Sequence, residues 1–437
     1  MCTGKLLGQL SLPQLPCGGL GLSVNSLLSL GFQLLREQLF SAFRARGGGI
    51  SDAQVAPQKF DSITMLVCFL GVLAVFGDQA FVVADHSGES AGGGTAGLRL
   101  LPIDSEGKPG DQYSRVGAAL KLRASKSTLK YGEQMPMTPV LAVNTVRLFP
   151  SAATGIQLNV NEFDKVALEA GHFTRQTGVD SSNSDDKFTT DYALKRGGTA
   201  ITYDSASFLG GRYQEGNLSL ALYAGQLEDA WHQYYGNTKY TYAIDEGRRL
   251  AFDFNIYRTL DYGKSLAGPI NNTSWSFSTA YTTGAHTVTV VHQRINGDEP
   301  LDWIGFGTMG GTVNIGNAVQ YATFTEANER SWQLRYDFDF AALGIPGLSF
   351  MTRYVRGDGM DNSHSHNPYY TARHVYDTDK DNKHWERNFD IKYVIQSGPA
   401  RDMSFRLRQS THRGTSGYRY IDIDEVRLIT EFPVNIF

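Results

Sequence analysis

Two arginines near the end of the chain have the type and spacing needed to bind an anion. Arg406 and Arg408 stand two residues apart in "MSFRLRQS", so on an extended strand both side chains project to the same side. The same alternation points Lys392 and Arg427 to that side of neighbouring segments. Guanidinium groups pair with carboxylates through two parallel hydrogen bonds. We therefore predict a row of four cations on one wall, with side chains whose chemistry suits carboxylates. In the alternative interpretation, they only neutralise nearby carboxylates such as Asp390.

The segments that must position these cations alternate apolar and polar residues with a period of two. From about residue 117 onward, roughly fifteen segments of about 8–11 residues follow this pattern, separated by turn residues. In "SWQLRYDFDF", one face is apolar and the other carries amides and charges: Trp332, Leu334, Tyr336, Phe338 and Phe340 oppose Gln333, Arg335, Asp337 and Asp339. This periodicity predicts an all-β chain of antiparallel strands.

The composition of the two faces favours a transmembrane β-barrel over a soluble sandwich. So many large aromatic residues on one face would need an unusually large core, and the polar faces hold isolated arginines in mid-strand. A lipid-facing outer surface around a wet interior accounts for both features, and such a barrel closes because no unpaired backbone can face hydrocarbon. Connection lengths agree. We expect tight turns at 282–286, 343–348 and 397–402, and long loops at about 226–248, 295–317 and 357–385.

The overall composition excludes several other classes of protein. The chain has 437 residues and a formal net charge of -4, so it lacks the global basic field that nucleic acid attracts. Its cysteines, Cys2, Cys17 and Cys68, give neither a disulfide framework nor metal-ligand spacing. A hydrolase triad of His172, Asp229 and a serine is conceivable, but no nucleophile-elbow motif is present. We predict no enzyme activity and no cofactor.

Residues 1–95 differ from the rest of the chain. They form a Leu-, Gly- and Ser-rich stretch without a clear period, and Ser62 to Gly77 contains no charged residue. That run is shorter than the about 20 apolar residues of a membrane-spanning helix, and it lies too far along the chain for a signal peptide. Three interpretations stay open: a disordered extension, a segment out of frame through a displaced start, and an anchor or export signal. We expect an atypical segment at 1–95 and the barrel at 96–437.

From about residue 97 to 437, the chain resembles the OprD family of substrate-specific outer-membrane porins. The matching stretches occur in order and include "LKYGEQMP", "RLFPSAATG", "HQYYGNT", "FDFNIYRT", "GDEPLDWIGFG", "NERSWQLRYDF", "KYVIQSGPARDMSFRLRQSTHRG" and "EVRLITEFP". The resemblance implies a monomeric, 18-stranded barrel in the outer membrane of a Gram-negative bacterium, of which about the first four strands have no match here.

The resemblance also implies a function. Such porins, narrowed by inward-folded loops, pass small carboxylate-bearing solutes by passive diffusion, including amino acids, organic acids and carbapenem antibiotics. The implied partners are these solutes, outer-membrane lipid and lipopolysaccharide, and barrel-assembly machinery, for which the terminal Phe437 is the expected signal. A truncated, non-conducting barrel or a surface structural or adhesion protein is the alternative function.

Single residues acquire roles from the same resemblance. A basic ladder that guides a substrate carboxylate through the pore corresponds here to Arg147, Lys392, Arg406, Arg408 and Arg427. On the opposite wall, Tyr321 matches an acidic and hydroxyl-bearing patch. Thr323 stands where a close relative has an aspartate that attracts the cationic end of arginine or lysine, and Ala318 stands at a serine position. This departure favours selectivity for the carboxylate alone.

Two loops carry further hypotheses. The stretch "GDEPLDWIGFGTMGG" (297–311) corresponds to an infolded loop of the family, and a lone external loop is the alternative. The stretch "HSHNPYYTARHVYDTDKDNKH" lacks the glycine and late glutamate of a calcium loop, so we predict a solvated extracellular loop rather than a metal site. Its candidate ligands are His364, His366, His374, His384, Asp377, Asp379 and Asp381.

Overall fold

The computed structural model describes residues 63–67, 71–81, 102, 112–147, 149–193, 200–307, 309–372, 375–415, 418 and 422–433. The chain divides into units 1–53 and 54–437, and all described residues belong to the second. The three interpretations of residues 1–95 fall mostly outside the described residues, as does the terminal Phe437. The predicted boundary at 95/96 lies outside them too and stays a prediction.

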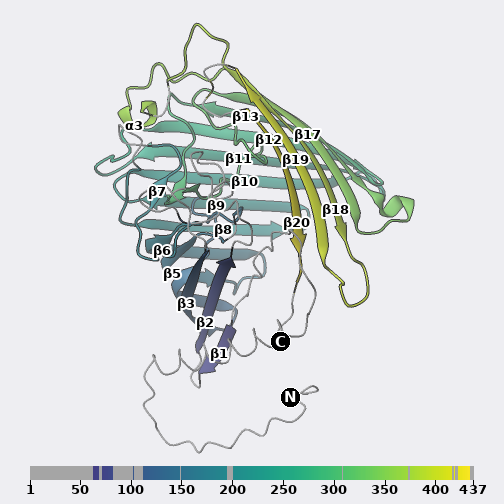
Figure 1. Cartoon of the computed structure of the whole chain (residues 1–437), viewed down its shortest axis with the longest axis horizontal. Coiled ribbons are helices and arrows are strands. Elements are labelled where there is room, and N and C mark those ends of the chain that lie inside the picture. Colours follow the sequence, from purple (N-terminus) through teal and green to yellow (C-terminus); the bar gives the residue numbers. More distant parts are fainter. Residues whose placement is uncertain are drawn as a thin grey trace, which may run out of the picture. The chain divides into compact units, whose positions relative to one another are not determined.

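One antiparallel sheet of 17 strands dominates the structure (Figure 1). Each strand pairs with the next one along the chain, apart from three short strands that form a separate sheet. The strands of the large sheet are β1 (Ile63–Val67), β2 (Gly71–Phe81), β3 (Gln112–Ala124), β4 (Ser127–Gln134), β5 (Ala152–Val160), β6 (Val166–Thr177), β8 (Ala206–Glu215), β9 (Leu218–Leu227), β10 (Trp231–Ala243), β11 (Arg248–Asp261), β12 (Asn271–Thr283), β13 (His286–Asn296), β16 (Arg330–Asp339), β17 (Leu348–Asp358), β18 (Lys383–Val394), β19 (Ser404–Gly414) and β20 (Ile423–Glu431).

The large sheet exposes its apolar face and covers its polar face. In β16, Trp332 and Leu334 are 56% and 58% exposed, whereas Gln333 between them is 6% exposed. The same inversion recurs in β12, where Phe277 is exposed and Ser276 is buried. A soluble sandwich would bury the aromatic face. The observed pattern is that of a sheet whose outer face meets lipid and whose inner face is polar.

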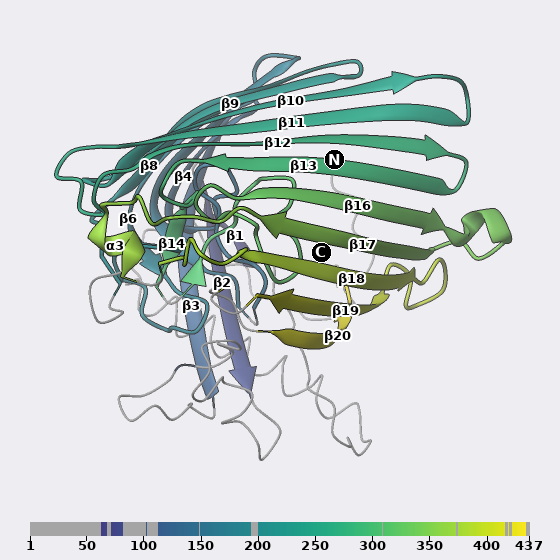
Figure 2. The ribbon, with the colours of Figure 1, turned by 90° about the horizontal axis from the view of Figure 1, so that it is seen from above.

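Connection lengths differ between the two ends of the strands. At one end, strands are joined by short turns such as 125–126, 216–217, 244–247 and 284–285. Figure 2 shows the turns of β10–β11 and β12–β13 at the right-hand side. At the other end lie the long connections 135–151, 178–205, 297–329 and 359–382. The turn between β16 and β17 contains the 3-10 helix η1 (Phe340–Leu343), and the connection 359–382 contains the helix α3 (Pro368–Thr371). Within the described part of the chain, no helix has the length and apolarity to span a membrane.

Two features depart from the sequence prediction. The stretch 226–248, expected as a long loop, is mostly strand β10, because its "WHQYYGNTKYTYA" sequence carries aromatic residues on both faces and hides the alternation. No strand was predicted before residue 97, whereas the structure places β1 and β2 there. Their sequences are mostly apolar, and Asp78 is their one charged residue, so the period-two test misses them. In the large sheet, the described strands from β3 to β20 number fifteen and agree with the predicted number.

Three of the long connections pack together. Two of them supply the strands of the small sheet, β7 (Thr189–Thr190), β14 (Ile304–Phe306) and β15 (Met309–Gly310). Buried side chains of all three connections form one hydrophobic cluster with inward side chains of the large sheet. The connections contribute Leu141, Tyr203, Trp303 and Phe306, and the sheet contributes Tyr257. These connections therefore lie against the polar face of the sheet.

Candidate functional site

Strands β18, β19 and β20 place the four predicted cations on the polar face. Their flanking residues Ile391, Phe405, Leu407 and Leu428 are exposed on the apolar face, and alternation sends Lys392, Arg406, Arg408 and Arg427 to the other side. The register sets Lys392 opposite Arg406, and Arg408 opposite Arg427. Cross-strand neighbours on one face lie close enough to act on the same anion.

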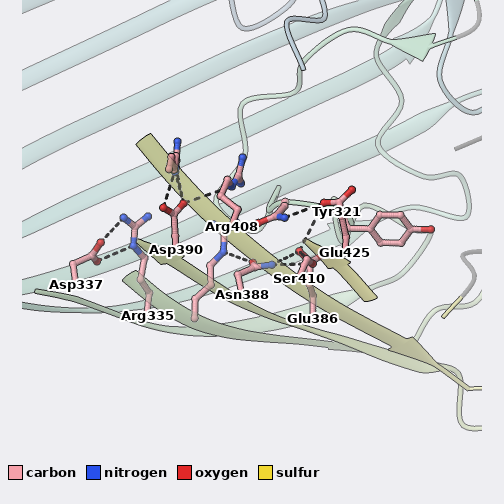
Figure 3. Close-up of polar contacts among 12 residues, drawn as sticks. Tyr321, Arg335, Asp337, Glu386, Asn388, Asp390, Arg408, Ser410 and Glu425 are labelled. Atoms are coloured by element: carbon pink, nitrogen blue, oxygen red, sulfur yellow. Dashed lines mark hydrogen bonds and ion pairs between the residues drawn. The ribbon is translucent and has the colours of Figure 1, made fainter. Parts of the chain in front are cut away.

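Each of these cations has a carboxylate partner. Arg406 Nε donates to both oxygens of Asp390, at 2.9 and 2.8 Å, and Arg408 Nε lies 3.5 Å from Asp390 Oδ2. Arg427 pairs with Glu425 at 2.5 Å, and Lys392 with Glu431 at 3.4 Å. The ion pairs with Asp390 that the alternative interpretation names are therefore present (Figure 3), and they leave open whether the cations also bind a solute.

The shared carboxylate lies beneath the arginines. The Asp390 side chain is 5% exposed, whereas those of Arg406 and Arg408 are 37% and 21% exposed. One buried negative charge thus serves two cations that solvent still reaches. This arrangement leaves an excess positive charge at the surface of the polar face, and an entering anion meets guanidinium groups before it meets Asp390.

Two further arginines extend the row, and sequence reasoning gave them no role. Arg335 of β16 lies opposite Arg353 of β17 in the register. Arg335 donates to both carboxylate oxygens of Asp337, at 2.8 and 2.6 Å, and Arg353 Nε donates to Asn388 Oδ1 at 2.6 Å. The signal was present, since both residues occupy the inward phase of alternating segments, "SWQLRYDFDF" and "LSFMTRYVRGD".

The segment that carries Tyr321 and Thr323 is fastened to these same strands. Glu386 of β18 accepts hydrogen bonds from the backbone N–H groups of Tyr321 and Ala322, at 3.0 and 2.7 Å. Gln320 donates to Glu425 of β20 at 3.0 Å. The resemblance placed this segment on the opposite wall, whereas its backbone adjoins the wall that bears the arginines (Figure 3).

The connection 297–329 folds inward, as one of the two hypotheses for 297–311 proposed. Gln233, on the polar face of β10, donates to the carbonyl oxygen of Asp302 at 2.9 Å. Tyr257 of β11 accepts from the N–H of Asn314 at 3.1 Å, and Gln293 of β13 donates to the carbonyl oxygen of Phe324 at 2.6 Å. Inward side chains from three strands thus hold this connection against the polar face, and the alternative of a lone external loop is wrong.

A buried carboxylate organises the packed connections. Asp302 accepts hydrogen bonds from the backbone N–H groups of Asp191, Tyr192 and Trp303, at 3.0, 3.0 and 2.8 Å, and from the Tyr370 hydroxyl at 3.0 Å. Burial, and secondly the negative charge of Asp191, raise the pKa of Asp302 to about 6. One residue thus ties together the connections 178–205, 297–329 and 359–382.

The comparisons with known proteins agree with this geometry. The model of the outer-membrane porin family OprD matches residues 82–436. The chain belongs to the OprD family. It is 45% identical to Porin D of Pseudomonas aeruginosa over 346 residues, covering 78% of this chain and 76% of that one. Among solved structures, it is similar to Pseudomonas aeruginosa OprD, with a TM-score of 0.71, 41% identity and coverage of 84% and 87%. It is also similar to OpdK with vanillate, from the same organism, with a TM-score of 0.70, 28% identity and coverage of 84% and 89%.

Membership in the OprD family settles the fold class and the location. The all-β chain has the fold of a transmembrane β-barrel, and it is an outer-membrane protein of a Gram-negative bacterium. Its apolar face is therefore the lipid-facing surface, and its polar face lines the lumen. OprD-family proteins are porins, which are channels rather than enzymes.

The fifth predicted ladder residue lies in a connection and not on β18–β20. Arg147 belongs to the connection between β4 and β5, where its Nη1 donates to the Val146 carbonyl oxygen at 3.3 Å. The described strand pairings do not bring this connection beside β18–β20. Its assignment to the ladder stays a prediction.

The remaining candidates separate in the structure. His172 Nδ1 lies 2.8 Å from Ser207 Oγ, whereas Asp229 pairs with Lys264 at 2.6 Å, so the imagined triad is not assembled. Within the described residues, no group of His, Cys, Asp or Glu is arranged to hold a metal ion. His384 lies in β18 and not in the histidine-rich loop. It is buried, and its Nε2 lies 2.6 Å from Glu329 Oε1. His374 lies outside the described residues.

Proposed function

We propose that this porin is a passive, substrate-selective channel for small carboxylate-bearing solutes, which move along the lumen wall formed by β16–β20. The carrying observation is the pair Arg406 and Arg408, whose side chains solvent partly reaches above the buried Asp390. A solute carboxylate competes with Asp390 for the same guanidinium group, so each new contact replaces an existing one. Binding is weak and spread over several sites, which lets a solute leave as readily as it enters. The concentration gradient drives the flux, and no cofactor is required.

A relative supports the carboxylate as the recognised group. OpdK was solved with vanillate, an aromatic carboxylate. In this chain, Thr323 and Ala318 replace the acidic and serine positions expected from the family resemblance. The segment therefore lacks an added negative charge for the cationic end of lysine or arginine. We propose monocarboxylates, including amino acids, organic acids and carbapenems, as the solute class, with Arg147 and Tyr321 as further contacts.

Planar-bilayer recording of the purified barrel tests the proposal. We expect small channels with a mild preference for anions. The double substitution Arg406→Ala and Arg408→Ala removes both cations and leaves Asp390 uncompensated, so selectivity should shift toward cations. Arg248→Ala, at the exposed first residue of β11, serves as the control and should leave selectivity unchanged. Absence of conductance in the folded barrel would favour the alternative, a non-conducting barrel or a surface structural protein.

A further inference from the structure

The lumen face of β16–β20 has a nearly balanced set of charges. Four arginines on this face have carboxylate partners within ion-pair distance, as described above for Arg335, Arg406, Arg408 and Arg427. Lys392 has a partner in Glu431. A solute carboxylate that approaches any of these cations competes with an aspartate or glutamate already in place, and this competition weakens the attraction.

Arg353 differs from these neighbours. Its Nε donates to the neutral amide oxygen of Asn388 at 2.6 Å, and within the described part of the chain no carboxylate lies within ion-pair distance of it. The side chain is half-buried and projects to the lumen, since Tyr354 beside it is exposed on the lipid face and Val355 is buried. Among the described residues, Arg353 therefore forms no direct ion pair, although Glu386 and Asp390 lie near enough for their charges to act on it.

The orientation of the Asn388 amide is fixed by its other contacts. Its Nδ2 donates to Glu386 at 2.8 Å and to the Ser410 hydroxyl at 3.0 Å, so its Oδ1 must face Arg353. The negative charge of Glu386 is already engaged by these donors and by two backbone N–H groups of the loop. Asn388 thus holds the Nε edge of Arg353 and does not itself engage the two Nη groups.

We propose that Arg353 is the residue that selects carboxylates in this channel, and that it binds them end-on through its two Nη groups. The inference rests on the proposed function and deepens it. A planar guanidinium matches the two oxygens of a carboxylate. Arg335 and Arg408 add positive potential at Arg353, which the charges of Glu386 and Asp390 partly offset. Lysine at this position would keep the charge and lose the two-pronged geometry.

A matched pair of solutes separates recognition from general charge. Entry of N-acetylglycine and of N-acetylglycinamide into proteoliposomes is measured for the wild type and for Arg353→Lys, Arg353→Gln and Arg356→Gln. Arg356 lies on the same strand and is exposed on the lipid face, so its substitution is the control. Reversal potentials in a potassium chloride gradient report the charge of the lumen for each variant.

Arg353→Lys should lower the preference for the acid over the amide by about threefold to tenfold, the size of one solvated charged hydrogen bond, with the reversal potential unchanged. Arg353→Gln should lower both quantities, and Arg356→Gln neither. A wild-type preference that survives Arg353→Lys would overturn the inference and leave the proposed function intact. A wild type that admits acid and amide equally would instead overturn the proposed function. Single-channel conductance identifies the variants that fold. If Arg353→Gln misfolds, the comparison of Arg353→Lys with the wild type still tests the inference.

Discussion

Arg406 covers Asp390, and its Nε lies 2.9 and 2.8 Å from the two carboxylate oxygens. The carboxylate is almost fully buried, and the guanidinium remains in contact with solvent. The cations that line the lumen in this porin are therefore also members of structural ion pairs. The buried acid lowers the attraction of the row for solute anions, and its removal should raise that attraction.

Replacing Asp390 with asparagine should increase anion selectivity. The substitution keeps the shape and removes the one negative charge that Arg406 and Arg408 share. We expect the anion-to-cation permeability ratio to rise by roughly twofold or more, measured as the reversal potential in a salt gradient. Asp381→Asn, which removes the same charge from an exposed loop pair, is the control. An equal shift in both variants would show that only net charge matters.

Thr323→Asp should admit cationic solutes. Thr323 is half-buried in the segment fastened to β18, and its hydroxyl shares a hydrogen bond of 2.7 Å with Thr325. A carboxylate there would attract an ammonium group while the arginine row still holds the solute carboxylate. Entry of lysine relative to norleucine should rise several-fold, and Thr323→Asn should leave the ratio unchanged. If lysine entry is the same in the aspartate and asparagine variants, Thr323 does not influence this selectivity.

Gly357→Ala should loosen the connection 297–329, which folds against the polar face. A Cβ at Gly357 would lie 2.0 Å from Glu329 Oε1 and 2.8 Å from His384 Nε2, the two atoms whose contact holds the end of connection 297–329 to β18. The methyl group must break this contact, so we expect larger and noisier single-channel conductance. Gly247→Ala, where the nearest atom is 4.0 Å away, should behave as wild type. Identical traces for the two variants would contradict the anchoring role.

The packed connections should become less stable as the pH rises. The folded pKa of Asp302, about 6, exceeds its ordinary value of 3.8. A raised carboxyl pKa means that the folded state binds the proton more tightly, so the contribution is complete below about pH 4 and is lost through about pH 6. The difference corresponds to on the order of 3 kcal/mol. The denaturant midpoint of the wild type, measured relative to that of Asp302→Asn, should decrease as the pH is raised from 4 to 7. A difference between the two midpoints that does not change with pH would argue against this pKa.

Much of the barrel follows from local alternation. A period of two needs only neighbouring residues, so "SWQLRYDFDF" and "MSFRLRQS" predict both the strands and the face that each side chain occupies. The exposed Trp332 and covered Gln333 confirm that prediction. The test fails where both faces are aromatic, as in β10, and where no polar face exists, as in β1 and β2.

The sequence by itself determined that Arg406 and Arg408 share one side of a strand, because that depends on spacing alone. Only the tertiary structure decided what stands beside them. The register between β18 and β19 places Asp390 under both arginines, and the register of β17 with β18 gives Arg353 a neutral amide instead of an acid. Register and loop packing depend on contacts between residues far apart in the chain. The partner of each cation is therefore a property of the folded sheet and not of the segment that carries the cation.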